Sequence, residues 1–178
     1  MAYARQYTLE DVKGMLQIME GNINLASKTP VPANKRAPAH AMTLHSDVGA
    51  DAMKGRVLNE LKAKKKFATS AYQTFEMQAG ATRDILNCAT GQTELAKLDA
   101  KTEKRVQIRA ALTNRYLGYQ TKGQKAGGVK TTTEEGLHEV DEGMVICEAF
   151  VGGILQIQTS YPASFKGQEI KTTLADLI

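Results

Sequence analysis

A pair of glycines between two apolar runs, near the end of the chain, constrains the fold more than any other feature. Gly152 and Gly153 separate residues 144–150 from residues 154–161, and both runs are rich in β-formers. Two such runs joined by two glycines are typical of a β-hairpin, because glycine readily adopts the backbone angles of a tight turn. Side chains alternate along a strand, so one face of the second strand should carry two apolar and two hydroxyl side chains. These are Leu155, Ile157, Thr159 and Tyr161.

Helical periodicity marks several segments before the hairpin. Side chains that can cap a helix stand at the expected starts: Thr8 for the first helix, Ser46 or Asp47 for the second, and Ser70 or Thr74 for the third. The three helices should cover about residues 8–20, 46–64 and 74–87, and residues 92–109 keep helical character. We expect the first helix to be peripheral.

Extended segments are predicted mainly in the second half of the chain. Residues 67–72 and 110–119 favour strands, a glycine-rich loop over residues 123–128 follows, and the hairpin comes last. Helices first and antiparallel strands afterwards predict an α+β fold, in which N-terminal helices pack against a C-terminal antiparallel β-sheet.

The length of 178 residues suits one main domain with short additions at its ends. Pro30, Pro32 and Pro38 fall in a segment that can be neither helix nor central strand. We therefore expect residues 1–40 to be an N-terminal helix and a proline-rich linker that can be removed, residues 41–165 to be the main domain, and residues 166–178 to be a C-terminal tail.

The net charge of +4 hides a segregation of charge along the chain. Residues 101–130 carry eight lysines and arginines against Glu103 alone, residues 62–66 add four lysines, and residues 131–150 carry acidic residues without lysine or arginine. Such basic segments favour a polyanionic ligand or a solvated face. No apolar run approaches the roughly twenty residues of a membrane-spanning helix, so we predict no membrane anchor.

Proton-transfer chemistry has few possible sources, because His40, His45 and His138 are the only histidines. Cys88 and Cys147 lie far apart in the sequence and near no histidine at ligand spacing, so we predict no metal and no cofactor. His45 and Arg56 are eleven residues apart, which is about three turns of a helix and would place both side chains on one side.

These residues carry a resemblance to a known family. The histidine and arginine at this separation, the stretch ATSAY at residues 68–72, and the closing Thr159, Tyr161 and Pro162 resemble the ribonuclease A-like toxin domains at the C-termini of bacterial contact-dependent inhibition proteins and other polymorphic toxins. The resemblance covers about residues 45–162. In that family Val-Gly directly follows the histidine, whereas this chain reads HSDVG, which leaves the start of the helix open.

The resemblance implies a ribonuclease A-like fold and an endoribonuclease toxin that cleaves RNA, with transfer RNA as one candidate substrate, without metal. The 2′-hydroxyl would attack the phosphate and leave a 2′,3′-cyclic phosphate. A histidine, with an unperturbed pKa near 6.5, suits the proton transfer. The catalytic residues would be His45, Arg56, Thr159 and Tyr161. Further candidates for RNA binding are Lys64, Lys65, Ser70 and Arg115.

The resemblance also implies a role in bacterial competition. Such a toxin is secreted or delivered as an effector, acts in the cytoplasm of the target cell, and is neutralised in the producer by a cognate immunity protein. An acidic immunity protein would suit the basic segments.

Two other functions stay open. A mono-ADP-ribosyltransferase toxin is suggested by Arg56 and the Thr69–Ser70 pair, although Gln156-Ile157-Gln158 stands where such enzymes carry Glu-x-Glu. A non-catalytic RNA-binding domain is suggested by the basic segments alone, although aromatic residues, the usual platforms for base stacking, make up only 6% of the chain.

Overall fold

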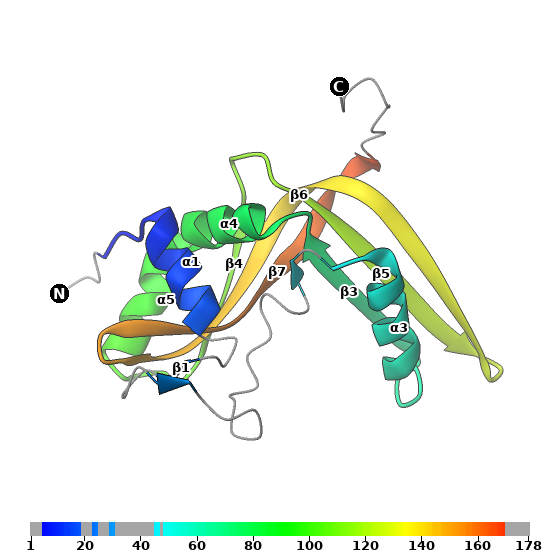
Figure 1. Cartoon of the computed structure of the whole chain (residues 1–178), viewed down its shortest axis with the longest axis horizontal. Helices are drawn as coiled ribbons and strands as arrows, with labels where there is room; N and C mark the ends of the chain where they lie inside the picture. Colours follow the sequence, from blue (N-terminus) through cyan, green and yellow to red (C-terminus); the bar gives the residue numbers. More distant parts are fainter. Residues whose placement is uncertain (1–4, 19–22, 25–28, 31–44, 47, 170–178) are drawn as a thin grey trace.

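The computed structural model describes residues 5–18, 23–24, 29–30, 45–46 and 48–169 (Figure 1). Four helices lie in this part of the chain: α1 (Leu9–Gln17), α3 (Ala50–Glu60), α4 (Phe75–Asn87) and α5 (Ala89–Asp99). The short strands β1 (Ile23–Asn24) and β2 (Thr29–Pro30) pair with each other. The main sheet contains β3 (Lys66–Tyr72), β4 (Val106–Ala111), β5 (Leu117–Ala126), β6 (Val129–Val151) and β7 (Ile154–Glu169). The predicted α+β class is therefore confirmed, with a five-stranded antiparallel sheet.

Strand β6 organises the sheet, because it is long enough to pair with three neighbours. Its first part pairs with β5, up to Glu139, and its second part pairs with β4 between Glu142 and Cys147. Strand β7 pairs with β6 from His138 onward and overlaps both of these ranges, so it lies on the opposite edge of β6. The sheet thus has two arms, one with β3 and β5 and one with β4 and β7, which meet at a bend in β6 (Figure 1).

The bend coincides with irregular strand pairing. Three successive register shifts between β6 and β7 fall between His138 and Gly143, where the two arms meet. Extra residues in one strand increase the local twist and bend the strand. The two hairpins that build the arms turn at Gly127–Gly128 and at Gly152–Gly153, all four with positive φ. The second of these confirms the predicted hairpin.

The hydrophobic core lies on the arm formed by β4, β6 and β7, which α1, α4 and α5 cover (Figure 1). Helix α1 belongs to this core, since Val12 and Leu16 are fully buried. The side-chain amide of Asn87 also donates to the carbonyl of Tyr7 and accepts from its N–H, both at 2.8 Å. The predicted cap at Thr8 is confirmed, as a capping box with Asp11. The expectation of a peripheral helix is wrong, and this packing argues against removing residues 1–40, whose boundary at about residue 40 lies outside the described residues.

Helix α3 packs against the other arm. A side chain at Gly123 would overlap Val57 and Leu61, so this glycine lets the helix approach β5 closely. We expected Gly123 in a loop, but it lies inside a strand. The helix begins after Gly49 and not at Ser46 or Asp47; Ser46 instead forms a parallel bridge with Tyr72 of β3.

Other element boundaries also need correction. The predicted helix over residues 92–109 is α5 followed by β4, in which Val106 and Ile108 are both buried in the alternating manner of a strand. The predicted strand over residues 110–119 comprises the end of β4, a connection over residues 112–116 and the beginning of β5. Strand β7 continues through Glu169, so the first residues of the expected tail at 166–178 belong to the sheet. By contrast, β3 and α4, capped by Thr74, agree with the predictions.

A carboxylate on α4 fastens the connection between β4 and β5. Asp84 accepts hydrogen bonds from Tyr116, Asn114 and Arg83 at 2.5, 2.8 and 2.7 Å. Burial raises the pKa of Asp84, but these hydrogen bonds outweigh it and hold the pKa below its usual value. A carboxylate whose pKa is lower in the folded chain than in the unfolded chain stabilises the fold at pH values above its unfolded pKa. This contribution is lost as the pH falls through its folded pKa.

We therefore expect Asp84→Asn to flatten the acid dependence of stability. Between about pH 5 and pH 2, the free energy of unfolding in urea should fall more steeply for the unmodified chain than for the variant. Asp99→Asn, at the end of α5, is the matched control. Equal slopes for the unmodified chain and Asp84→Asn would remove Asp84 from the acid response.

Candidate active site

The middle of β7, from Thr159 to Tyr161, faces a different side of the sheet from the beginning of the strand. Ile157 pairs with Cys147, whereas Thr159 pairs with the preceding residue of β6, Ile146, so Gln158 is an extra residue in β7. Paired residues share a face. Cys147 lies in the core with Leu155 and Ile157, whereas Ile146 lies outside that cluster.

This bulge overturns the prediction that Leu155, Ile157, Thr159 and Tyr161 share one face. The two apolar residues face the helices, and the two hydroxyl residues face the opposite side. There they line a cavity of about 350 Å³. Bulges commonly redirect a side chain beside a functional site.

The cavity lies between the two arms of the sheet, where β3 approaches the middle of β7. Its lining residues come from the segment before α3, from α3, β3, β6 and β7, and from the turn before β4. They are His45, Arg56, Phe67, Ala68, Thr69, Ser70, Arg105, Ile146, Gln158, Thr159 and Tyr161. All four residues predicted to be catalytic, and Ser70, therefore meet at one cavity.

His45 is held in a defined orientation. Its Nδ1 lies 2.6 Å from the carbonyl oxygen of Ser70, and its ring centroid lies 5.1 Å from that of Tyr161. Only 5% of His45 is exposed. Because a carbonyl oxygen can only accept, Nδ1 must donate, which leaves Nε2 as the ring nitrogen that can take up a proton. The bridge from Ser46 to Tyr72 anchors this segment beside β3.

Two arginines make the cavity positive. Arg56 donates to the hydroxyl of Thr69 at 3.0 Å, and its guanidinium lies over the ring of Phe67. Burial lowers the pKa of Arg56, and the Glu60 carboxylate opposes this shift; an arginine stays charged at neutral pH in either case. Arg105 adds a second guanidinium. No aspartate or glutamate of the described residues lines the cavity, so the site favours an anion.

Buried polar atoms without protein partners mark the wall formed by β7. The hydroxyl of Thr159 and the side-chain carbonyl of Gln158 are buried and have no hydrogen-bond partner among the described residues. A buried hydroxyl without a partner costs free energy, which a ligand that uses it would recover. The neighbouring Ser160 faces the other way: its carbonyl accepts from Gln78, and its hydroxyl lies 2.6 Å from that of Thr82. These contacts to α4 fix the strand behind the cavity.

The remaining predicted binding residues do not line this cavity. Lys64 pairs with Glu60, and its Nζ lies 4.6 Å from the ring centroid of Phe67. Lys65 precedes β3. Arg115, on the connection from β4 to β5, pairs with Glu139 of β6. Ser70 lines the cavity and donates to the carbonyl of Pro162 at 2.6 Å, which ties β3 to β7.

Sequence reasoning missed Arg105 and Gln158 as parts of the site. Arg105 was visible only as one member of the basic segment. Gln158 was noted only as an amide in place of an acid, and nothing in the sequence indicated that a bulge would turn it inward.

The described residues contain no group of three or more histidine, cysteine or acidic side chains placed to hold a metal ion. Among the same residues, no helix is long and apolar enough to cross a membrane. No protein-family model, curated protein or solved structure matches the chain.

Proposed function

We propose that the protein is a metal-independent endoribonuclease with a ribonuclease A-like fold. The observation that carries this proposal is the convergence of His45, with Nε2 able to take up a proton, and two arginines on a cavity without lining carboxylates. Cleavage of RNA by its own 2′-hydroxyl needs a base, cationic donors for the phosphorane and an acid for the leaving oxygen. The cavity supplies a side chain for each of these tasks.

In the proposed reaction, Nε2 of His45 removes the proton of the ribose 2′-hydroxyl, and the 2′-oxygen attacks the adjacent phosphorus. Arg56 and Arg105 balance the charge on the non-bridging oxygens, and Thr159 donates a neutral hydrogen bond. The bond from phosphorus to the 5′-oxygen then breaks, and the hydroxyl of Tyr161 protonates the leaving oxygen. The products are a 2′,3′-cyclic phosphate and a 5′-hydroxyl. Exchange with water returns the proton from His45 to Tyr161.

The biological setting stays part of the proposal. A toxin delivered into the cytoplasm of competing bacteria would use this activity on cellular RNA, and an immunity protein would have to cover the cavity in the producing cell. The amide of Gln158 in the cavity wall, where ADP-ribosyl transfer would need a carboxylate, favours RNA cleavage over the transferase alternative.

We expect the purified protein to cleave total RNA in the presence of EDTA, because the proposed reaction uses only side chains. The new 3′ ends should resist ligation until acid opens the cyclic phosphate and a phosphatase then removes the remaining monophosphate. The new 5′ ends should accept phosphate from a kinase. Loss of activity in EDTA that returns with added magnesium would contradict the metal-independent mechanism.

A further inference from the structure

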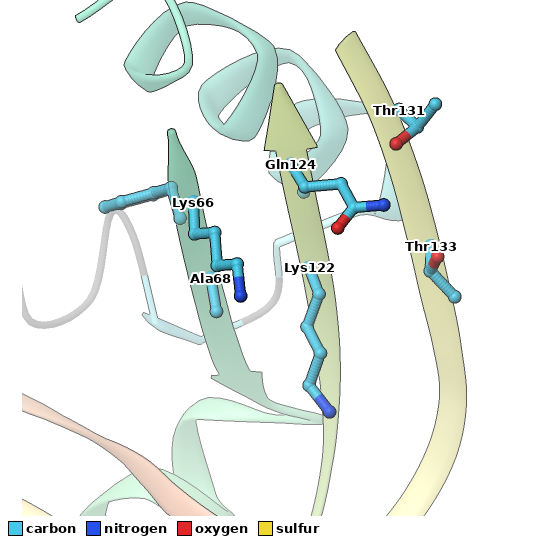
Figure 2. A pocket seen from close by; sticks show the side chains of 8 residues that line it. Lys66, Ala68, Lys122, Gln124, Thr131 and Thr133 are labelled. Atoms are coloured by element: carbon cyan, nitrogen blue, oxygen red, sulfur yellow. The ribbon is translucent and has the colours of Figure 1, made fainter. Parts of the chain in front are cut away.

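A second hollow lies on the arm formed by β3, β5 and the first part of β6, on the other side of β3 from the candidate active site. It has a volume of about 590 Å³ and is lined by the side chains shown in Figure 2: Lys66, Ala68, Lys122, Gln124, Thr131 and Thr133. In the strand register Lys66 lies opposite Gln124, and Ala68 opposite Lys122. Thr131 and Thr133 continue these two rows on β6.

This hollow lies on the face of the arm that α3 does not cover. Gly123 faces Val57 and Leu61 of α3. Since side chains alternate along a strand, its neighbours Lys122 and Gln124 face the other side. Both lysines are exposed. Their side chains run along the strands in the same direction, toward the end of β3 (Figure 2).

The chemistry of the hollow suits phosphate groups. Two ammonium groups, two threonine hydroxyls and one amide surround it, and none of the described residues that line it is acidic. Lysine and hydroxyl side chains commonly bind the nucleic-acid backbone without reading its sequence.

The two hollows adjoin. Phe67 and Ala68 line both of them, so only β3 separates the second hollow from His45 and Arg56. A strand of RNA whose scissile phosphate occupies the candidate active site would continue past β3 into the second hollow.

We propose that this second hollow, hereafter the flanking-phosphate site, binds backbone phosphates of single-stranded RNA next to the cleaved bond. The inference rests on the proposed ribonuclease activity. Because the contacts are electrostatic, the site should favour long substrates over short ones and should not select a base.

Paired substitutions test the flanking-phosphate site. Lys66→Gln with Lys122→Gln removes two charges from it, and the matched control, Lys13→Gln with Lys97→Gln, removes two charges from α1 and α5 on the other arm. The site variant should lose the preference of the unmodified protein for a twelve-nucleotide RNA over a dinucleotide, measured as kcat/KM. Cleavage of the dinucleotide should stay unchanged.

Binding to a fluorescent twelve-nucleotide DNA, which lacks the 2′-hydroxyl and cannot be cut by this chemistry, gives a second readout. Two phosphate contacts to a single strand correspond to a salt slope of roughly 1.4, so between 50 and 200 mM salt the affinity of the unmodified protein should fall roughly sevenfold more than that of the site variant. The control pair should keep the slope of the unmodified protein.

The outcomes separate this inference from the proposed function. If the unmodified protein cuts no RNA but binds the DNA through Lys66 and Lys122, the ribonuclease proposal fails and the phosphate site stands. An unchanged length preference and salt slope in the site variant would overturn the phosphate site alone. The proposed phosphate site would also be overturned if the variant at Lys66 and Lys122 lost binding to poly-glutamate but not to the oligonucleotide. These lysines would then suit an acidic protein.

Discussion

Replacement of His45 by alanine should lower the rate of RNA cleavage by about two to four orders of magnitude, the usual contribution of a general base. The carbonyl of Ser70 fixes the proton on Nδ1 and so makes Nε2 the acceptor. Alanine removes that acceptor but leaves both arginines of the cavity in place. Initial rates on a defined oligoribonucleotide at neutral pH measure the effect.

Two further variants protect this test against a loss of folding. His45→Gln keeps a side chain of similar size in the buried position but cannot take up a proton near neutral pH, so its rate should fall about as far. His138→Gln is the matched control, because His138 lies outside the cavity, beside Lys166 and Phe165. A His45→Ala protein with the melting temperature and the cleavage rate of the unmodified chain would remove His45 from the mechanism.

The sequence pointed to the four residues of the proposed site, but not to the geometry that brings them together. His45 and Arg56 were expected to share one side of a helix, whereas the helix begins only after Gly49 and His45 reaches the cavity through its contact with Ser70. Thr159 reaches it through the bulge at Gln158. Such a bulge depends on how β7 pairs with β6, and the alternation of side chains within β7 alone does not reveal that pairing.

The sequence-based predictions are correct where residues close together in the sequence determine the local structure. The caps at Thr8 and Thr74 and the glycine turn of the last hairpin are set by neighbouring residues, and all three are confirmed. The predictions for residues 92–119 failed because the spacing of the apolar residues fits both a helix and a strand. Only pairing with β6 selects a strand for Val106 and Ile108.

The basic segment illustrates the same limit. Arg109 and Arg115 pair with Glu142 and Glu139 of β6, so the acidic stretch that follows in sequence neutralises part of the basic one in space. Arg105 lines the candidate active site, and Lys122 lies on the flanking-phosphate site. An acidic immunity protein that covers the active site would therefore meet Arg105, but not these paired arginines as free charges.

The N-terminal helix gives the second large expected effect. A chain that starts at residue 41 lacks Tyr7, Val12, Met15 and Leu16, each at most 5% exposed. Burial of such side chains contributes about 1.5–3 kcal/mol each, and the total stability of a domain is about 5–15 kcal/mol. The truncated chain should therefore lose its cooperative unfolding transition, measured by circular dichroism in urea, which reverses the expectation that residues 1–40 can be removed.

Point substitutions in the full chain show whether packing of α1 is the cause. Leu16→Ala should lower the free energy of unfolding by about 2–5 kcal/mol, because it opens a cavity between α1 and the core. Lys13→Ala, on the same helix, should change it by less than about 0.5 kcal/mol, since its ion pair with Glu10 lies at the surface. If the chain starting at residue 41 unfolded cooperatively at the urea midpoint of the full chain, and Leu16→Ala left that midpoint unchanged, α1 would be an appendage and the expected division at residue 40 would stand.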